Sequence, residues 1–349
     1  MSDLAGWSLH GPVHTLRTGH AEWDLSLEQW RAAQQFTMAR FRRDGRLGGI
    51  EYHNPDGSVP RSTYVYGPAG QLQESRFDMD EGRTTKTVYH YDESGRLARV
   101  VTVDRDGTER ETEVYRYGLD GKRTKTWFIS TPEPNACYGI DCSEQTYDTT
   151  GAPVIAARGA GRQPVDEVLV YDEDHRLVRR MICTRDAADR LVSEEIDLGE
   201  QGLFPNFDQA LENAPPGARE SARAMLAEVF GPGNVLSSTT YAYDEYGRLL
   251  ERRTLMGNLG GHRTTYRYDD RGNLSGETSE HHSREMRIDG EGNIHPAKET
   301  SHTQHVRFEY RHDAQENWTE RVAWIRLEPN PDFGRSNLVR REITYYAAE

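Results

Sequence analysis

Residues 89–97 read Tyr-His-Tyr-Asp-Glu-Ser-Gly-Arg-Leu, and this pattern returns with small changes along the chain. Other clear copies begin at Tyr64, Tyr241 and Tyr266. Copies that follow one another directly are 25 or 26 residues apart, as between Tyr66 and Tyr91 and between Tyr91 and Tyr117. A constant period of this length is typical of repeat architectures, in which each copy is one supersecondary unit.

The centre of each copy has the residues of a tight β-hairpin turn. An Asp at the first turn position accepts hydrogen bonds from the turn amides, and a Gly at the fourth tolerates a positive φ. The pairs with this predicted structural role are Asp92 with Gly95, Asp244 with Gly247, and Asp269 with Gly272. Further turn signals lie about halfway between the copies, at 54–57 and 104–107. Each repeat therefore predicts two antiparallel strands of about eight residues.

These copies resemble the YD-repeat family, also called Rhs repeats, which occurs in bacterial toxin shells and in teneurins. The similarity extends from about Phe41 to Trp318 with one interruption. In that family the hairpins form a spiral antiparallel sheet, which closes into a hollow shell in the long members. This chain resembles a short form that lacks the family's C-terminal Rhs core motif. The resemblance implies an architecture and does not imply a reaction.

The predicted fold class is all-β, a long antiparallel meander of hairpins. Because sheets of more than about ten strands curl or split, we expect a spiral or partly open sheet. A small helical insertion interrupts it, since apolar residues from Ala222 to Phe230 recur at helical spacing. The expected segments of this continuous domain are an N-terminal strand or edge segment (1–36), the first part of the sheet (37–195), the helical insertion (196–234) and the second part of the sheet (235–349).

The composition excludes several classes of partner. The 349 residues have a net charge of −14, from 43 Lys and Arg against 57 Asp and Glu, which argues against nucleic acid. The sequence contains no apolar run of about 18 residues, so no membrane span is predicted. Without a recognisable secretion signal, we expect a cytoplasmic protein, with export by a signal-independent route as the alternative.

The sequence carries few motifs of known catalytic or cofactor-binding chemistry. The sequence has no phosphate-binding loop, zinc-protease motif or nucleophile elbow, and we predict no catalytic residue, no cofactor and no metal. His302 and His305 are three residues apart, which places them on opposite faces of a strand. Cys137 and Cys142 have the spacing of a disulfide or half a metal site, but ordinary reduced thiols, Cys183 included, are the favoured interpretation.

The aromatic residues that recur at the same positions of each copy form rows across the predicted sheet. They are the remaining candidates for ligand binding. Aromatic side chains on one face of a curled sheet can stack on sugar rings or hold a polypeptide. Tyrosines that only stabilise the sheet, as a ladder of side chains from strand to strand, would be aligned in the same way. This structural role is the favoured interpretation. The candidate ligand-binding residues are Tyr66, Tyr91, Tyr243, Tyr246, Tyr268 and Trp318.

Three functional hypotheses follow. The first is a non-enzymatic YD-repeat scaffold that binds a macromolecular partner, protein or polysaccharide, on its concave surface or through residues 196–233. The second is an accessory or truncated toxin-shell piece of an Rhs-like system. The third is a glycan-acting enzyme, which needs two carboxyl groups about 5 to 9.5 Å apart in a pocket. The sequence names no such pair.

Overall fold

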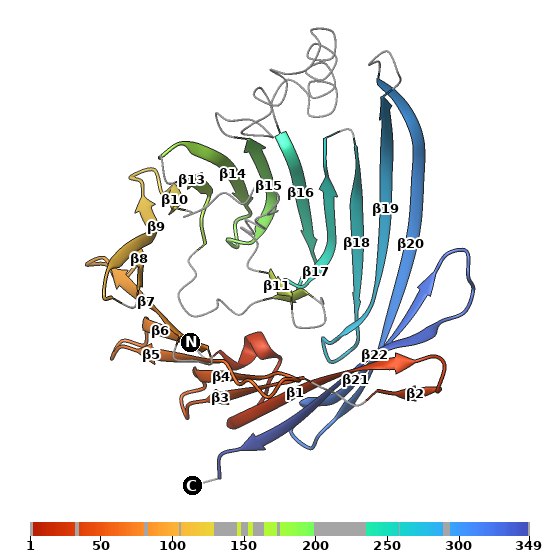
Figure 1. Ribbon diagram of the computed structural model, residues 1–349, viewed down its shortest axis with the longest axis horizontal. Helices are drawn as coiled ribbons and strands as arrows, with labels where there is room; N and C mark the ends of the chain where they lie inside the picture. Colours follow the sequence, from red (N-terminus) through yellow and green to blue (C-terminus); the bar gives the residue numbers. More distant parts are fainter. Residues whose placement is uncertain are drawn as a thin grey trace.

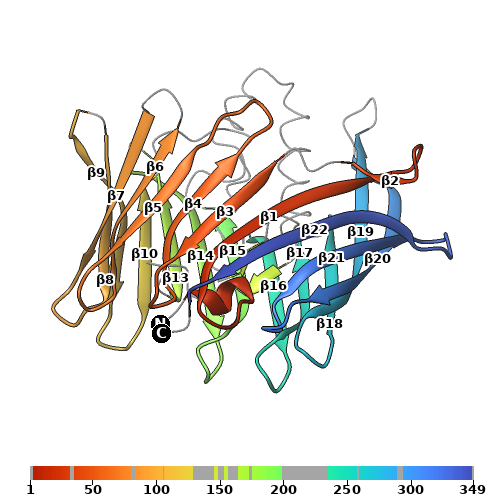
Figure 2. The same ribbon diagram turned by 90° about the horizontal axis from the view of Figure 1, so that it is seen from below.

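The computed structural model describes residues 3–31, 35–79, 83–104, 106–128, 145–147, 153–155, 164–172, 175–198, 235–257, 259–288 and 294–347. These residues form one sheet of 20 strands and a separate two-stranded sheet. Figures 1 and 2 show the strands of the large sheet following one another around a ring. The predicted antiparallel β structure is confirmed, because every pairing in the ring except one is antiparallel.

The strands of the large sheet are β1 (Val13–Asp24), β2 (Gln29–Trp30), β3 (Phe36–Phe41), β4 (Leu47–His53), β5 (Arg61–Tyr66), β6 (Leu72–Met79), β7 (Arg83–Tyr91), β8 (Leu97–Val103), β9 (Glu109–Tyr117), β10 (Arg123–Phe128), β13 (Glu167–Tyr171), β14 (Leu177–Arg185), β15 (Leu191–Leu198), β16 (Val235–Tyr243), β17 (Leu249–Leu255), β18 (Gly260–Tyr268), β19 (Leu274–Ile288), β20 (Ile294–His312), β21 (Trp318–Leu327) and β22 (Gly334–Tyr345). The small sheet contains β11 (Gln145–Tyr147) and β12 (Pro153–Ile155).

The ring is closed, so the prediction of a spiral or partly open sheet is wrong. The first strand, β1, pairs on one side with β3 and on the other with the last strand, β22. Among the described residues 19 strands complete the ring, because β2 pairs only with β1. Closure satisfies the backbone groups that β1 and β22 would expose as edge strands. The strands that close the ring lie at the two ends of the chain, outside the clear copies of the repeat.

One parallel pair explains the odd number of strands. Strands that alternate in direction around a ring must be even in number, so 19 strands require one exception, which is β10 against β13. Arg123 at the start of β10 holds this junction. Its guanidinium donates hydrogen bonds to Asp166 at 2.8 Å and to Asp189 at 2.7 Å.

The structure also corrects two other predictions. The predicted helical insertion starts too early, because residues 196–198 belong to β15, and its remaining residues lie outside the described part of the chain. Within the described residues the only helix is η1 (Leu4–Trp7), a single 3-10 turn. Cys183 in β14 is disulfide-bonded, so the prediction of a reduced thiol is wrong for this residue.

The two faces of the ring differ in chemistry. Figure 1 shows η1 on the inner side of the ring, where Leu4 and Trp7 pack against buried residues that include Leu16 and Phe41. Side chains alternate along a strand, so Leu16 faces inward and Arg17 faces outward. A second inner cluster lies around Leu97, Met181 and Leu249, each of which is fully buried. The outer face displays ion pairs, such as Arg17 with Glu342.

The repeated residues form one repeated structure. In the turn after β7, the Asp92 carboxylate accepts hydrogen bonds from the amides of Ser94 and Arg96, each at 2.9 Å, and Gly95 has a φ of +75°. The second tyrosine of a copy then donates its hydroxyl hydrogen to a leucine carbonyl on a neighbouring hairpin. This bond occurs in Tyr91 to Leu72, Tyr117 to Leu97, Tyr243 to Leu191 and Tyr268 to Leu249. Tyr310, at the first aromatic position of its copy, donates to the Leu274 carbonyl in the same way.

The tyrosine bonds lead to a first prediction. Replacing Tyr268 by phenylalanine should lower the free energy of unfolding by about 1 kcal/mol, because the Leu249 carbonyl loses its 2.9 Å hydrogen bond while the ring stays packed. Urea denaturation followed by circular dichroism measures the change. Tyr246 has a 75% exposed side chain, so Tyr246→Phe is the matched control and should change stability by less than 0.5 kcal/mol, the usual range for surface substitutions. Equal effects of the two variants would contradict a stabilising role for the hydrogen bonds from tyrosine hydroxyls to leucine carbonyls.

Candidate binding site

The predicted ligand-binding aromatics are mostly engaged within the fold. Burial raises the pKa values of Tyr91 and Tyr268 to about 12, so both hydroxyls remain donors at neutral pH. The Tyr66 hydroxyl donates to the Asp3 carboxylate at 3.1 Å. Trp318 is 6% exposed, and the Arg341 guanidinium lies 3.4 Å from its ring centroid.

The other two members of that set have different surroundings. The Tyr243 hydroxyl donates to the Leu191 carbonyl, and the Arg190 guanidinium lies 5.0 Å from the Tyr243 ring. Tyr246 is exposed at a turn, where Arg248 covers its ring at 5.0 Å. The structure therefore does not bring the six predicted residues together in one groove. Tyr243 and Tyr246 share the hairpin of β16 and β17, and the other four residues lie on four further hairpins around the ring.

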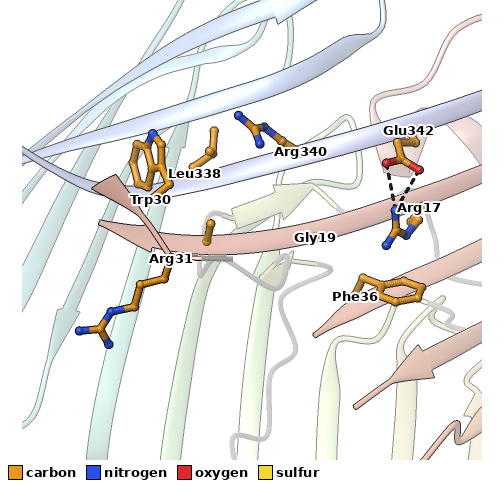
Figure 3. Close-up of a pocket in the computed structure, with 9 residues that line it drawn as sticks. Arg17, Gly19, Trp30, Arg31, Phe36, Leu338, Arg340 and Glu342 are labelled. Carbon is orange, nitrogen blue, oxygen red and sulfur yellow. Dashed lines mark hydrogen bonds and ion pairs between the residues drawn. The ribbon is translucent and has the colours of Figure 1, made fainter. Parts of the chain in front are cut away.

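A shallow pocket does occur on the outer face, where β22, β1 and β3 lie side by side and β2 folds over the end of β1. Its volume is about 220 Å³. We call it the outer pocket, and its lining residues are Arg17, Gly19, Ala21, Trp30, Arg31, Phe36, Leu338, Arg340 and Glu342. Figure 3 shows these side chains on the outer side of the strands. None of them belongs to the sequence-predicted set.

The register explains why these residues meet. Gly19 in β1 is the partner of Arg340 in β22 and of Phe36 in β3, while Ala21 is the partner of Leu338. Because Gly19 and Ala21 have little or no side chain, the large neighbours stand around a low apolar floor. The pocket is thus a consequence of two small residues on the outward face of one strand.

The turn between β1 and β2 positions the aromatic wall. The carboxylate of Asp24 accepts hydrogen bonds from the Ser26 hydroxyl at 2.6 Å, the Ser26 and Leu27 amides, and the Arg31 guanidinium at 3.1 Å. These bonds, that of the Ser26 hydroxyl first, lower the pKa of Asp24 to about 2. The bonded turn brings Trp30 back over β1, with its ring 5.0 Å from that of Trp23.

Ion pairs with glutamates on neighbouring strands fix the position of two arginines of the outer pocket, Arg17 and Arg340. Arg17 donates to both oxygens of Glu342, at 2.9 and 3.1 Å, and its guanidinium carbon lies 4.1 Å from the Phe36 centroid. Arg340 donates to Glu320 at 3.1 Å, and its side chain remains 67% exposed. Guanidinium groups beside aromatic rings and an apolar floor suit a ligand that combines a carboxylate with apolar surface.

A second cluster lies on the inner face, where three imidazoles stack across β18, β19 and β20. The ring centroids of His262 and His281 are 4.0 Å apart, and those of His281 and His302 are 4.6 Å apart. Thr264 hydrogen-bonds with His262 Nε2 at 2.9 Å. Burial, and then the neighbouring His281, lower the pKa of His262 to about 4. These near-parallel rings stack, and their nitrogens do not converge on one point.

The histidine stack leads to a pH prediction. Between pH 6.5 and about 4 the unfolded chain binds a proton at His262 that the folded chain does not, so acidification should destabilise the fold. After allowance for the partial exposure of the ring, the expected contribution is about 1 to 2 kcal/mol. Comparing the melting temperatures of wild type and His262→Gln at pH 7 and pH 4 isolates it. The variant should lose less stability on acidification, whereas His282→Gln, at an exposed position, should follow wild type. Parallel pH profiles for all three proteins would contradict the prediction.

The described part of the chain contains neither a metal-binding cluster nor a membrane-spanning helix. Across these ranges no group of three or more His, Cys, Asp or Glu side chains is arranged to hold a metal ion. In the same part of the chain, no helix has the length and apolar character needed to cross a membrane.

Sequence comparisons identify no relative, since no family model and no curated protein matches the chain. Among solved structures, a porin-like protein from Bacteroides uniformis is similar with 11% identity and a TM-score of 0.33, over 96% of this chain and 99% of that chain. A porin-like protein from Bacteroides vulgatus has 10% identity and a TM-score of 0.23 over the same shares. A structure described as TcdB2-TccC3-TEV has 14% identity and a TM-score of 0.22, and the match covers 83% of this chain but 19% of that one.

Proposed function

We propose that the protein is a non-enzymatic β-scaffold that binds an acidic macromolecular partner at the outer pocket. The main support for this proposal is that Arg17 and Arg340 lie with the rings of Trp30 and Phe36 around an apolar floor. The pocket is large enough for one side chain or one ring of a ligand, so a macromolecule would insert a single group there. The closed ring supplies the rigid wall that holds these residues in place.

The inner face supports a structural role for the tyrosine rows. Tyrosine hydroxyls that donate to leucine carbonyls, as Tyr91 does to Leu72, are already satisfied within the fold. Such rings stabilise the wall and leave few free polar groups for a ligand. Partner binding on the outer face is therefore compatible with the repeat, whose recurring tyrosine, aspartate, glycine and leucine positions build the scaffold rather than the pocket.

The proposal is tested by measuring the binding of acidic polymers to the wild type and to a variant whose outer pocket is filled by a larger side chain. Two acidic polymers, poly-L-glutamate and polygalacturonate, are titrated onto the immobilised protein at low and high salt by biolayer interferometry. We expect at least one polymer to bind with an affinity that falls as salt rises, because the pocket offers guanidinium groups. Ala21→Phe should weaken this binding at least about fivefold by occupying the floor.

The matched control introduces the same ring elsewhere on the outer face. Val65 in β5 is 48% exposed, so Val65→Phe should bind as wild type does. Failure of both polymers to bind, or equal binding by wild type and Ala21→Phe, would remove the proposal.

A further inference from the structure

We infer that a row of arginine and aromatic side chains beside the outer pocket binds an acidic segment of a partner protein. This inference rests on the proposed function, since it specifies the partner of the same surface. We call the set the arginine–aromatic row, and its members are Arg307 in β20, Trp324 in β21, Arg335 in β22 and Trp23 in β1. Figure 2 shows these four strands side by side along one wall of the ring.

The row follows directly from strand pairing. Arg307 is the partner of Trp324, and Trp324 is the partner of Arg335. The guanidinium carbon of Arg335 lies 4.5 Å from the Trp23 centroid and 5.2 Å from the Trp324 centroid. That of Arg307 lies 5.4 Å from the Trp324 centroid. Because Trp23 also contacts Trp30, the row continues into the outer pocket without a break.

The cations of the row are available for a ligand. Arg335 is exposed, and among the described residues it stacks between two indoles without a carboxylate partner. A guanidinium that stacks on a ring keeps its planar set of N–H donors for carboxylates, and its position is fixed before the ligand arrives. Arg307 is also exposed and pairs with the exposed Glu309 at 3.1 Å, a contact that a ligand carboxylate can replace at small cost.

The chemistry of the row favours a peptide over other polymers. Guanidinium groups lie over Trp324 and Trp23, so the row presents charge more than free aromatic faces for sugar rings. The net charge of −14 opposes a nucleic acid, which would bring a negative charge with every phosphate. A short acidic segment meets the row alone and avoids the rest of the acidic surface.

The spacing of the cations also fits an extended peptide. Arg307 and Arg335 are separated by one strand, hence by about 9 to 10 Å. An extended chain rises about 3.3 Å per residue, so the carboxylates of two glutamates spaced two to four residues apart reach both guanidinium groups. Residues between the glutamates would lie over Trp324, and apolar residues that follow the glutamate at Arg335 would lie toward Trp30 and the outer pocket.

The experiment uses a defined peptide and the full chain. A blocked eight-residue peptide of alternating glutamate and serine is titrated by isothermal calorimetry at 50 mM and 300 mM salt, next to its glutamine version. We expect the glutamate peptide to bind and the glutamine peptide not to bind. We also expect Arg335→Gln to weaken the binding about tenfold or more, the effect of losing one desolvated charge-assisted contact. Arg271→Gln, at an exposed turn position, is the matched control and should bind as wild type does.

The outcomes separate the two proposals. If the peptide does not bind but polygalacturonate binds and Ala21→Phe abolishes that binding, the proposed function stands and the acidic-peptide inference is overturned. If Arg335→Gln and Arg307→Gln both bind the peptide as wild type does, the row is not the site and the inference is overturned. Unchanged far-ultraviolet circular dichroism excludes misfolding of these variants, and Arg307→Gln provides a second test if Arg335→Gln does not fold.

Discussion

Replacing Asn317 by alanine is expected to lower the free energy of unfolding by about 2 to 4 kcal/mol. Asn317 is fully buried in the turn before β21. Its Oδ1 accepts a hydrogen bond from the His10 amide at 2.6 Å, and its Nδ2 donates to the His10 carbonyl at 2.9 Å and to the Tyr345 hydroxyl at 2.7 Å. One amide side chain thus holds the N-terminal segment and the last strand to the same turn.

The expected loss is large because alanine removes three hydrogen bonds of one fully buried side chain at once. The His10 backbone loses two hydrogen bonds, and the Tyr345 hydroxyl keeps only its bond to Asp313. These groups lie where β1 and β22 close the ring, so the local defect should also raise amide hydrogen exchange in both strands.

A turn in another copy supplies the control for Asn317→Ala. Asn273 has the equivalent place in its turn, where its Nδ2 donates to Asp269 at 3.0 Å, but it is only partly buried. Asn273→Ala should cost about 1 kcal/mol or less. Urea titrations of the two variants give the comparison. Similar losses would show that Asn317 has no special part in closing the ring.

The local structure of the repeat could be predicted from the sequence because its determinants lie within nine residues. Asp92 and Gly95 specify their turn by short-range hydrogen bonding and by a positive φ, and neither depends on the rest of the chain. The alternation of tyrosines with polar residues likewise indicates which side chains share a face. Strand direction within each hairpin follows from the same turn.

Closure of the ring could not be predicted in this way. It depends on the twist summed over all strands and on the pairing of β1 with β22, whose residues do not carry the repeated pattern. The parallel pairing of β10 with β13 is also invisible in the sequence, because Arg123 and Asp166 are 43 residues apart. A meander of hairpins is equally compatible with an open sheet and with a closed ring until these long-range contacts are known.

The outer pocket was missed for a related reason. Its residues come from three separate stretches of the chain, and the register of β1 against β3 and β22 brings Gly19, Phe36 and Arg340 together. The sequence contains one usable signal, which is that Arg17, Gly19 and Ala21 alternate with buried Leu16 and Thr18. Small residues on the exposed face of a strand mark a place where larger neighbours surround a gap.

Leu249→Ala is expected to cost about 3 kcal/mol, within the range for deleting a buried leucine side chain. Leu249 is fully buried in the inner cluster, and it lies opposite Tyr243 across the hairpin, while its carbonyl accepts the hydrogen bond of Tyr268. A cavity there removes apolar contacts of both tyrosines. The next residue, Leu250, is 41% exposed on the other face, so Leu250→Ala should cost about 0.5 kcal/mol or less.

The pair of leucine variants tests which face of the repeat is the core. A register shifted by one residue would exchange the two side chains and reverse the order of the two losses, since strand side chains alternate between faces. Urea titrations of both proteins, fitted with a common slope, decide between the registers. A larger loss for Leu249→Ala means that the Tyr-x-Tyr-Asp-x-x-Gly-x-Leu pattern builds the inner wall and leaves the outer wall, with its arginines and tryptophans, free to bind a partner.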